Sequence, residues 1–261
     1  MQRQQWLSTV QPEQRLLFAK VLDAAQSSAA HHKKTATDFM DRNKSNDFFE
    51  KVKYMQDIKA MIFGGNEQSE RCMIAFAPSY MELTEEDFPI KALHITKNKK
   101  FGQANLSHRD YLGSILGLGI DRAKVGDIIV LEEETICYIH RDLAEYVQNT
   151  LEYVSRTKVN VSVSDIFVVT LPEKVWKYHT VTVASLRLDA IASGGFHLAR
   201  AKVQEYIKKE IVQVNWNIVT SPSLLLKEGD MVSIRGYGRI KLFKIGNVTK
   251  KDRICVTVGR E

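Results

Sequence analysis

Apolar residues in the first 70 positions recur at helical spacing. Between residues 16 and 25 they fall three or four positions apart, on one side of a helix that Pro12 can begin. A second apolar series follows Asn46 and Asp47, which are possible helix caps, and it stops at Gly64-Gly65. The members of this series are Phe48, Phe49, Val52, Met55, Ile58, Met61 and Ile62. The pattern predicts a helical N-terminal domain over residues 1–70.

From Arg71 the pattern changes to short apolar or alternating runs, which are typical of strands. These runs cover residues 72–77, 90–95, 128–131, 135–139 and 159–163, and helical patterns cover residues 107–116 and 141–154. The resulting order is strand, strand, helix, strand, strand, helix, strand. Such an order predicts a compact α+β domain of the ferredoxin-like or RNA-recognition type over residues 71–180.

The last part of the chain, residues 181–261, combines two short helical patterns with several strand patterns. After a connection over residues 171–179, helical patterns cover residues 186–191 and 197–209, and Ser193-Gly194-Gly195 predicts a break between them. Strand patterns follow at residues 211–215, 218–219, 231–235 and 240–245. We therefore expect a third domain of two helices and a small sheet, and an α+β class for the whole chain.

The composition is that of a globular protein, but the charge is unevenly distributed. Of the 261 residues, 44% are hydrophobic and 26% are charged, which excludes a disordered or collagen-like chain. Residues 181–261 carry 14 Lys and Arg against 7 Asp and Glu, a surplus of +7 in a chain whose net charge is +6. Residues 71–180 carry 13 against 15, a net −2. The basic C-terminal domain has the charge expected of a module that approaches a polyanion.

Several other classes of protein find no support in the sequence. No apolar run is long enough to cross a membrane and the start lacks the pattern of a secretory signal, so we expect a cytoplasmic protein. The widely spaced cysteines predict reduced thiols and no zinc site. His-Arg-Asp occurs at residues 108–110 and 140–142, yet the asparagine of a kinase loop is missing after both. We interpret both tripeptides as helix starts and expect no catalytic residue, metal, cofactor or small-molecule substrate.

Cations of the C-terminal domain gather on one predicted helix face and one predicted turn. In the second helical pattern Val203, Tyr206 and Ile207 share a packed face, whereas Arg200, Gln204 and Lys208 lie four apart on another. Arg187 belongs to the preceding helical pattern, and a second group of cations surrounds Gly236-Tyr237-Gly238. The predicted RNA-binding residues are Arg187, Arg200, Lys202, Lys208, Lys209, Arg235, Arg239 and Lys241.

Motifs in this region resemble the RNA-binding domain named after the fourth protein of the small ribosomal subunit. The resemblance covers roughly residues 181–245. It rests on Arg187-Leu188-Asp189, Ala199-Arg200, Val212-Gln213-Val214-Asn215, Lys227-Glu228-Gly229-Asp230 and Ile234-Arg235-Gly236. It implies an L-shaped pair of helices on a small sheet, with Arg187 and Arg200 at RNA-contacting positions. Two positions depart from the family: Ala199 stands where serine is usual, and Trp216 stands where glycine is usual.

A longer motif upstream is similar to the hallmark of bacterial YlmH-type proteins. It runs from His108 to Ile120 and continues with Arg122 and Val125-Gly126-Asp127-Ile128. The resemblance extends over the whole chain, with one departure at Arg42, where relatives usually have proline. It implies a ribosome-associated RNA-binding protein. Its expected partners are ribosomal RNA and tRNA on a large subunit that carries obstructed peptidyl-tRNA, and the family also has a link to cell division.

The central domain has few of the exposed aromatic residues that an RNA-recognition sheet uses for stacking. Residues 72–77 supply only Phe76 and residues 159–163 supply none, so we expect the domain to face a protein partner or to be structural. The charge and the motifs predict a non-enzymatic, RNA-binding factor, and the resemblance to YlmH-type proteins implies a role in ribosome-associated quality control. Two alternatives remain open: an RNA-modifying enzyme that uses the basic domain for delivery, and a cell-division scaffold.

Overall fold

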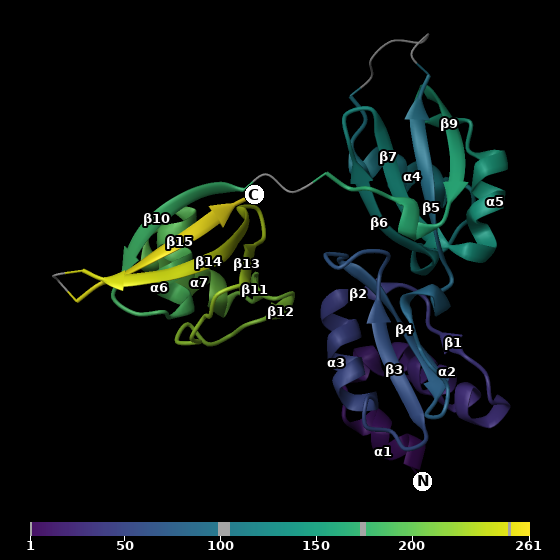
Figure 1. Cartoon of the computed structure of the whole chain (residues 1–261), viewed down its shortest axis with the longest axis horizontal. Helices are drawn as coiled ribbons and strands as arrows, with labels where there is room; N and C mark the ends of the chain where they lie inside the picture. The colour runs from purple at the N-terminus through teal and green to yellow at the C-terminus, as the bar shows by residue number, and fades with distance from the viewer. Residues whose placement is uncertain (1, 99–104, 173–175, 250–251) are drawn as a thin grey trace. The chain divides into compact units, whose positions relative to one another are not determined.

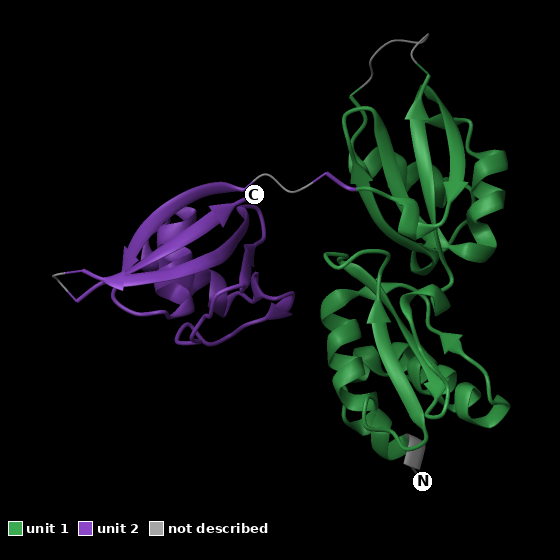
Figure 2. Ribbon diagram, in the orientation of Figure 1, with its two compact units in different colours: residues 1–170 green, residues 171–261 purple. Residues whose placement is uncertain are grey.

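The computed structural model describes residues 2–98, 105–172, 176–249 and 252–261 (Figure 1). The chain divides into two compact units, residues 1–170 and residues 171–261 (Figure 2). The C-terminal unit thus begins at residue 171, before the boundary expected at residue 181. None of the described helices is long and apolar enough to cross a membrane.

The first part of the N-terminal unit is a small antiparallel sheet covered by helices. Its elements are α1 (Gln2–Ser8), η1 (Pro12–Gln14), α2 (Arg15–His31), β1 (Thr35–Ala36), β2 (Met40–Asp41), α3 (Arg42–Val52), β3 (Ile58–Phe63) and β4 (Arg71–Pro78). Strand β4 is central: β3 pairs along one edge, and β1 and β2 pair along the other. Phe18, Leu22 and Phe48 from the helices pack on Ile74 and Phe76 of β4 to form the core.

This part differs from the helical domain that the sequence predicts. Helix α3 begins after Asp41, so Asn46 and Asp47 lie inside it instead of capping it, and it ends at Val52. The apolar residues from Ile58 onward form strand β3, because Ile58, Ala60 and Ile62 alternate toward the core. Strand β3 pairs with residues 73–78 of β4 over the whole length of β3. The N-terminal sheet therefore extends beyond the boundary predicted after residue 70.

The second part of this unit has the ferredoxin-like class that the sequence predicts, but the strand predicted first in it, residues 72–77, belongs to β4 of the N-terminal sheet. Its elements are η2 (Glu85–Asp87), β5 (Ile90–Lys97), α4 (His108–Gly117), η4 (Arg122–Lys124), β6 (Val125–Val130), β7 (Glu134–His140), α5 (Arg141–Thr150), β8 (Tyr153–Val154), β9 (Thr157–Ser164) and η5 (Ile166–Val168). The strands are antiparallel in the order β6-β7-β5-β9-β8. With α4 and α5 between the strands, this order is that of a ferredoxin-like sandwich.

Both His-Arg-Asp tripeptides lie at helix starts, which confirms their structural interpretation. The Asp110 carboxylate accepts hydrogen bonds from the backbone N–H and the hydroxyl of Ser107, at 2.8 and 2.7 Å, in front of α4. The ring Nδ1 of His140 accepts the backbone N–H of Asp142 at 3.3 Å in front of α5. These contacts satisfy N–H groups that a helix start would otherwise leave unpaired.

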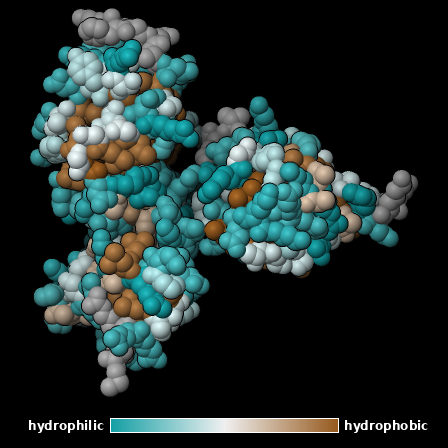
Figure 3. Space-filling model, turned by 180° about the vertical axis from the view of Figure 1, so that it is seen from behind, coloured by the Kyte–Doolittle hydropathy of each residue, from teal (hydrophilic) through white to brown (hydrophobic). Residues whose placement is uncertain are grey.

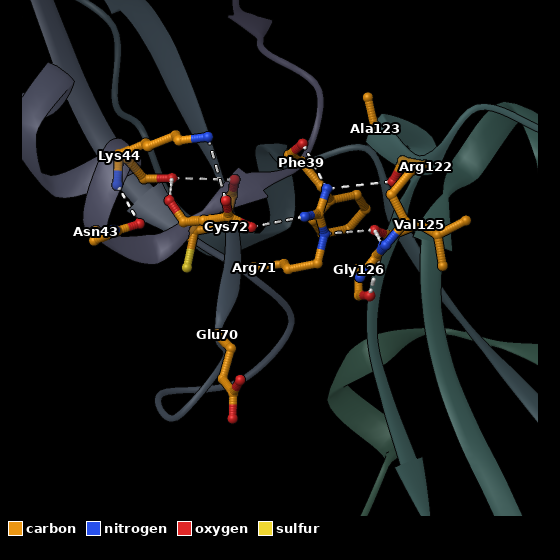
Figure 4. A network of polar contacts seen from close by, with 12 residues as sticks. Phe39, Asn43, Lys44, Glu70, Arg71, Cys72, Arg122, Ala123, Val125 and Gly126 are labelled. Atoms are coloured by element: carbon orange, nitrogen blue, oxygen red, sulfur yellow. Dashed lines mark hydrogen bonds and ion pairs between the residues drawn. The ribbon is translucent and has the colours of Figure 1, made fainter. Parts of the chain in front are cut away.

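Arg71, at the start of β4, connects the N-terminal sheet to the central sheet (Figure 4). Its Nε donates to the carbonyl of Val125 at 2.9 Å, and its Nη2 donates to the carbonyls of Phe39 and Arg122 at 3.0 and 3.2 Å. Its Nη1 pairs with Asp41 at 3.0 Å. One guanidinium thus joins β2, η4 and β6, and the two sheets form a single body within residues 1–170.

Close packing supports the same joint. A Cβ at Gly126 would lie 2.8 Å from the Phe39 ring and 3.0 Å from Cβ of Tyr138, so only glycine allows Phe39 to approach β6. The backbone N–H of Phe39 donates to the carbonyl of Ala123 at 2.8 Å, and Lys124 pairs with Asp38 at 2.5 Å. Gly126 and Arg122 belong to the long motif quoted above, so that part of the motif has a structural role here.

Asp127 gives the joint a predictable pH dependence. Its carboxylate accepts the backbone N–H groups of Glu70 and Arg71 at 2.7 and 3.0 Å, and burial raises its pKa from 3.8 to about 6. Because folding raises this pKa, the free energy of unfolding should fall as the pH rises from about 4 to about 6, by about 1.4 kcal/mol per pH unit. Asp127→Asn should remove this loss. Chemical denaturation of parent and variant at pH 4 and pH 7 measures it; parallel pH profiles would contradict the assignment.

The C-terminal unit is an antiparallel sheet with two helices on one face. Its elements are β10 (Lys177–Val183), α6 (Leu188–Phe196), α7 (Arg200–Lys208), β11 (Val212–Val214), β12 (Asn217–Ile218), β13 (Met231–Ile234), β14 (Gly238–Val248) and β15 (Ile254–Arg260). The strand order is β10-β15-β14-β13-β11-β12. Leu188, Ile191, Val203 and Ile207 from the helices pack on Ile240, Leu242, Val256 and Val258 from the strands.

Three features of this unit differ from the sequence-based expectation. Residues 177–179, expected to end a connection, begin strand β10, and neither β10 nor β15 was expected. Helix α6 continues through Gly194-Gly195 to Phe196. The glycines there serve packing: a Cβ at Gly195 would lie 2.4 Å from Cδ1 of Ile240, and one at Gly194 would lie 3.1 Å from the Val181 side chain. They let α6 lie close to the sheet.

Candidate nucleic-acid interface

Two arginines predicted to bind RNA share one buried carboxylate. Asp189, in the first turn of α6, has a side chain with no exposed surface. Arg187 donates to it through Nε and Nη2 at 3.1 and 3.3 Å, and Arg200 does so at 3.0 Å through each of the same two atoms. Nε2 of Gln204 adds a bond of 2.7 Å. We call Arg187, Asp189, Arg200 and Gln204 the arginine cluster.

The charge of Asp189 is held in place by these donors. Burial raises its pKa, but the hydrogen bonds from Arg200, Arg187 and Gln204 outweigh it and keep that pKa well below its usual range. The carboxylate is therefore ionised at any physiological pH. The side chains of Arg187 and Arg200 remain 36% and 47% exposed, and the bonds to Asp189 leave Nη1 of each guanidinium for a further acceptor. A phosphate is the acceptor that such paired, oriented guanidinium groups favour.

Local structure fixes the start of each helix. Arg187 immediately precedes α6, and the backbone N–H groups of Leu188 and Asp189 donate to the carbonyls of Leu224 and Pro222, at 2.8 and 3.2 Å. The loop before β13 therefore completes the first turn of α6. Arg200 is the first residue of α7, so both arginines lie at helix starts and their separation is set by the α6–α7 turn.

The lysines of α7 are less free to bind phosphate than the sequence suggests. Glu205 pairs with Lys202 at 3.5 Å and with Lys209 at 2.6 Å, so one acid partly neutralises two predicted cations. Lys208 is exposed on the same helix. Glu205 lies three residues after Lys202 and four before Lys209, and these are the spacings of helical ion pairs, so the sequence carried a signal for this neutralisation.

The predicted cations beyond the helices do not join the arginine cluster. Arg235 is exposed at the turn between β13 and β14. Arg239 and Lys241 lie on β14, beside Ser233 and Met231 of β13, whereas their neighbours Ile240 and Leu242 point into the core below the helices. Arg239 pairs with Glu261 at 3.8 Å. Because side chains alternate along a strand, Arg239 and Lys241 belong to the face of the sheet opposite α6 and α7.

The packed face of α7 agrees with the prediction. Val203, Tyr206 and Ile207 are all buried, and the Tyr206 hydroxyl shares a hydrogen bond of 2.7 Å with the hydroxyl of Tyr237. The turn between β11 and β12 is kept even though Trp216 replaces glycine, because Asn215 and Trp216 both take positive φ angles, 48° and 65°. The Asn215 side chain holds this turn through Asp230 and the backbone N–H of Met231, each at 2.9 Å.

Ala199 occupies the cap position of α7 and provides no side-chain hydrogen bond. A serine at this position would cap the helix. The alanine therefore lowers helix stability and also removes a hydroxyl from the surface. Ala199→Ser should raise the free energy of unfolding by about 1 kcal/mol. Urea denaturation measures it, with Ala201→Ser inside the helix as the control that should not stabilise. Equal effects of the two substitutions would contradict the capping role.

The surface of the C-terminal unit that Figure 3 shows is mainly hydrophilic. A helix pair with oriented arginines on an antiparallel sheet defines an RNA-binding domain, and residues 186–232 match the family model of the S4 domain. Residues 13–81 match "YlmH, N-terminal", and residues 84–167 match "Putative RNA-binding domain in YlmH". The resemblance found in the sequence is thus confirmed over all three regions.

The chain belongs to the YlmH family, as similarity to whole relatives also shows. It is 31% identical over 249 residues to a Bacillus subtilis (strain 168) protein named "Ribosome-associated protein quality control protein P2", covering 95% of this chain and 96% of that protein. A solved structure of "Cell division protein ylmH from Streptococcus pneumoniae" matches with a TM-score of 0.51 and 23% identity. That match covers 60% of this chain and 94% of the solved chain, and it supports the fold.

Proposed function

We propose that this protein is a non-enzymatic, cytoplasmic RNA-binding factor that associates with the large ribosomal subunit and its tRNA during quality control of stalled peptidyl-tRNA. The arginine cluster carries the proposal, because two guanidinium groups held by one carboxylate keep fixed positions for phosphate oxygens. The name of the Bacillus relative supports an association with ribosomes. In this proposal the helix pair binds RNA. The sequence predicts a protein-facing or structural role for the central domain, but residues 84–167 match a family described as a putative RNA-binding domain, so this domain is a second candidate for contact with RNA.

One group of residues, His94, Glu134 and Ser164, bears on the enzymatic alternative. Nε2 of His94 lies 2.8 Å from the hydroxyl of Ser164, and Nδ1 of His94 lies 3.0 Å from the carboxylate of Glu134. A nucleophilic serine needs this arrangement of hydroxyl, imidazole and carboxylate. However, the Ser164 hydroxyl also lies 3.1 Å from the carbonyl of Asp165, to which it can donate while it accepts from the imidazole. The group therefore suits a structural link between β5, β7 and β9. Cell division is supported only by the name of the Streptococcus protein.

Sedimentation with purified ribosomal subunits tests the proposal. We expect the protein to bind large subunits, more tightly when they carry peptidyl-tRNA, and to bind small subunits weakly. Each neutralised phosphate of duplex RNA should contribute a slope of about −0.9 to the dependence of log affinity on log salt, so affinity should fall steeply. Equal binding to both subunits, or none at low salt, would refute the proposal.

The enzymatic alternative has its own measurement. Mass mapping of ribosomal RNA from cells with and without the protein would reveal a missing modification if the protein were a modifying enzyme. We expect identical modification patterns. A modification that disappears with the protein would favour the enzyme instead.

A further inference from the structure

The face of the C-terminal sheet opposite α6 and α7 carries a cluster of aromatic side chains. The rings of Trp176 and Tyr178 both meet the ring of Phe243 edge to face, with ring centres 5.5 and 4.9 Å apart. Tyr178 is 61% exposed, and Trp176 and Phe243 are partly exposed. We call these three residues, with Lys241, the aromatic face. Exposed rings on a sheet contribute nothing to the core below the helices, whose members come from the alternate positions of the strands.

The strand register explains how these residues meet. Gly259 of β15 pairs with Tyr178 of β10 on one side and with Lys241 of β14 on the other, so the three lie in one row across the sheet. The register of β14 against β15 shifts between Leu242 and Lys244, which leaves Phe243 as an extra residue in β14. A Cβ at Gly259 would lie 2.6 Å from Cε2 of Phe243 and 3.0 Å from Cβ of Trp176. Because Gly259 has no side chain, the Phe243 ring can lie directly over it.

Cations surround the aromatic face. Nζ of Lys241 lies 5.2 Å from the centre of the Phe243 ring, and Lys244 follows on the same strand, exposed and paired in register with Thr257. The strand β10 begins with the exposed Lys177. Among the acids near β14, Glu261 pairs with Arg239, and Glu228 accepts the backbone N–H of Ile245 at 2.6 Å. Exposed rings interleaved with lysines are the combination that proteins use to stack bases and attract phosphates.

We propose that the aromatic face binds single-stranded RNA, with bases stacking on Tyr178 and Phe243 and phosphates attracted by Lys241, Lys244 and Lys177. This site goes beyond the proposed function, because it lies on the other side of the sheet from the arginine cluster. Strands β10, β14 and β15 also lie outside residues 186–232, where the S4 domain model matches. The C-terminal unit then holds structured RNA on its helices and an unpaired strand on its sheet.

Binding of fluorescent oligouridine by the full chain, followed by anisotropy without ribosomes, tests this site. Tyr178→Ala should weaken the affinity between about fivefold and about a hundredfold, because one stacked base is lost. Tyr178→Phe keeps a ring and should bind like the parent. Lys241→Gln should reduce the salt slope by about 0.7, the value for one phosphate contact of a single strand. Tyr54→Ala is the matched control, since Tyr54 is 80% exposed in the N-terminal unit, lies outside the regions that match RNA-binding families and should have no effect.

Three results would overturn the proposal. The first is oligouridine affinity that is unchanged in Tyr178→Ala. The second is loss of oligouridine binding in an arginine-cluster variant with retention in Tyr178→Ala, which would assign the strand to the helix pair. The third is loss of ribosome association in Tyr178→Ala with oligouridine affinity intact, which would make the face a protein contact. Because oligouridine binding is measured without ribosomes, its failure is distinguishable from a failure of the proposed ribosomal function.

Discussion

Asp189→Asn should weaken the binding of structured ribosomal RNA even though it makes the protein more positive by one charge. The substitution removes the carboxylate that fixes Arg187 and Arg200, each bound through two nitrogens. Two freed arginine side chains must then be immobilised by the RNA, at a cost of about 0.5–1.5 kcal/mol each. We therefore expect an affinity loss of about fivefold to a hundredfold, measured by filter binding at constant salt.

The matched control for this experiment removes a different acid from the same surface. Glu205→Gln changes the net charge by the same amount, but Glu205 neutralises Lys202 and Lys209 instead of orienting the arginine pair. It should strengthen RNA binding slightly. If Asp189→Asn also strengthens binding, net charge alone governs the interaction and the arginine cluster has no orienting role.

Arg187→Ala combined with Arg200→Ala should abolish RNA binding and also destabilise the C-terminal unit. The sequence suggests that this double variant stays folded, because both arginines are expected on the surface. In the structure they compensate the charge of a carboxylate with no exposed surface. Removing the partners of a buried charge costs about 3–5 kcal/mol, so the loss of RNA binding by this variant would be ambiguous.

Adding Asp189→Asn to the double variant resolves the ambiguity. The triple variant has no buried charge left to compensate, and Gln204 can still bond to the remaining amide. Its free energy of unfolding should recover most of the loss, whereas RNA binding should stay absent. The stability is measured by chemical denaturation and the binding by sedimentation with large subunits. A double variant as stable as the parent would contradict the coupling to Asp189.

Parts of the fold were predictable because apolar residues within single elements recur with a clear helical or strand period. In the central domain each strand is short, each helix has its own cap and the order of elements limits the topology, so the ferredoxin-like class is confirmed. The strand predicted first in this domain, residues 72–77, pairs in the N-terminal sheet instead. Strand β3 was missed because its apolar residues Ile58, Met61 and Ile62 also fit a helical period. Strand β10 was missed because Val181 and Val183 are its only aliphatic residues. Only pairing with β4 and β15 distinguishes these segments from their alternatives.

The candidate interface was predictable in its residue types and less so in its arrangement. The position of Arg187 and Arg200 on neighbouring helix starts agrees with the resemblance. Asp189 was quoted as part of a motif, but its role depends on burial, and a sequence does not show which acid is buried. Arg239 and Lys241 were predicted to bind RNA because they surround the Gly236-Tyr237-Gly238 turn of the basic domain. Strand alternation places them on the opposite face.

The central position of β4 also constrains the order of events while the chain is being synthesised. This strand is the last of its sheet in sequence and the one to which β1, β2 and β3 all pair, so the N-terminal sheet has no middle until residue 78 has left the ribosome. The Arg71 side chain can form its hydrogen bonds to the carbonyls of Arg122 and Val125 only after these residues have been synthesised. We expect the nascent N-terminal part to remain open to proteases until the first strand pair of the central sheet has emerged, and to become resistant in one step when that happens.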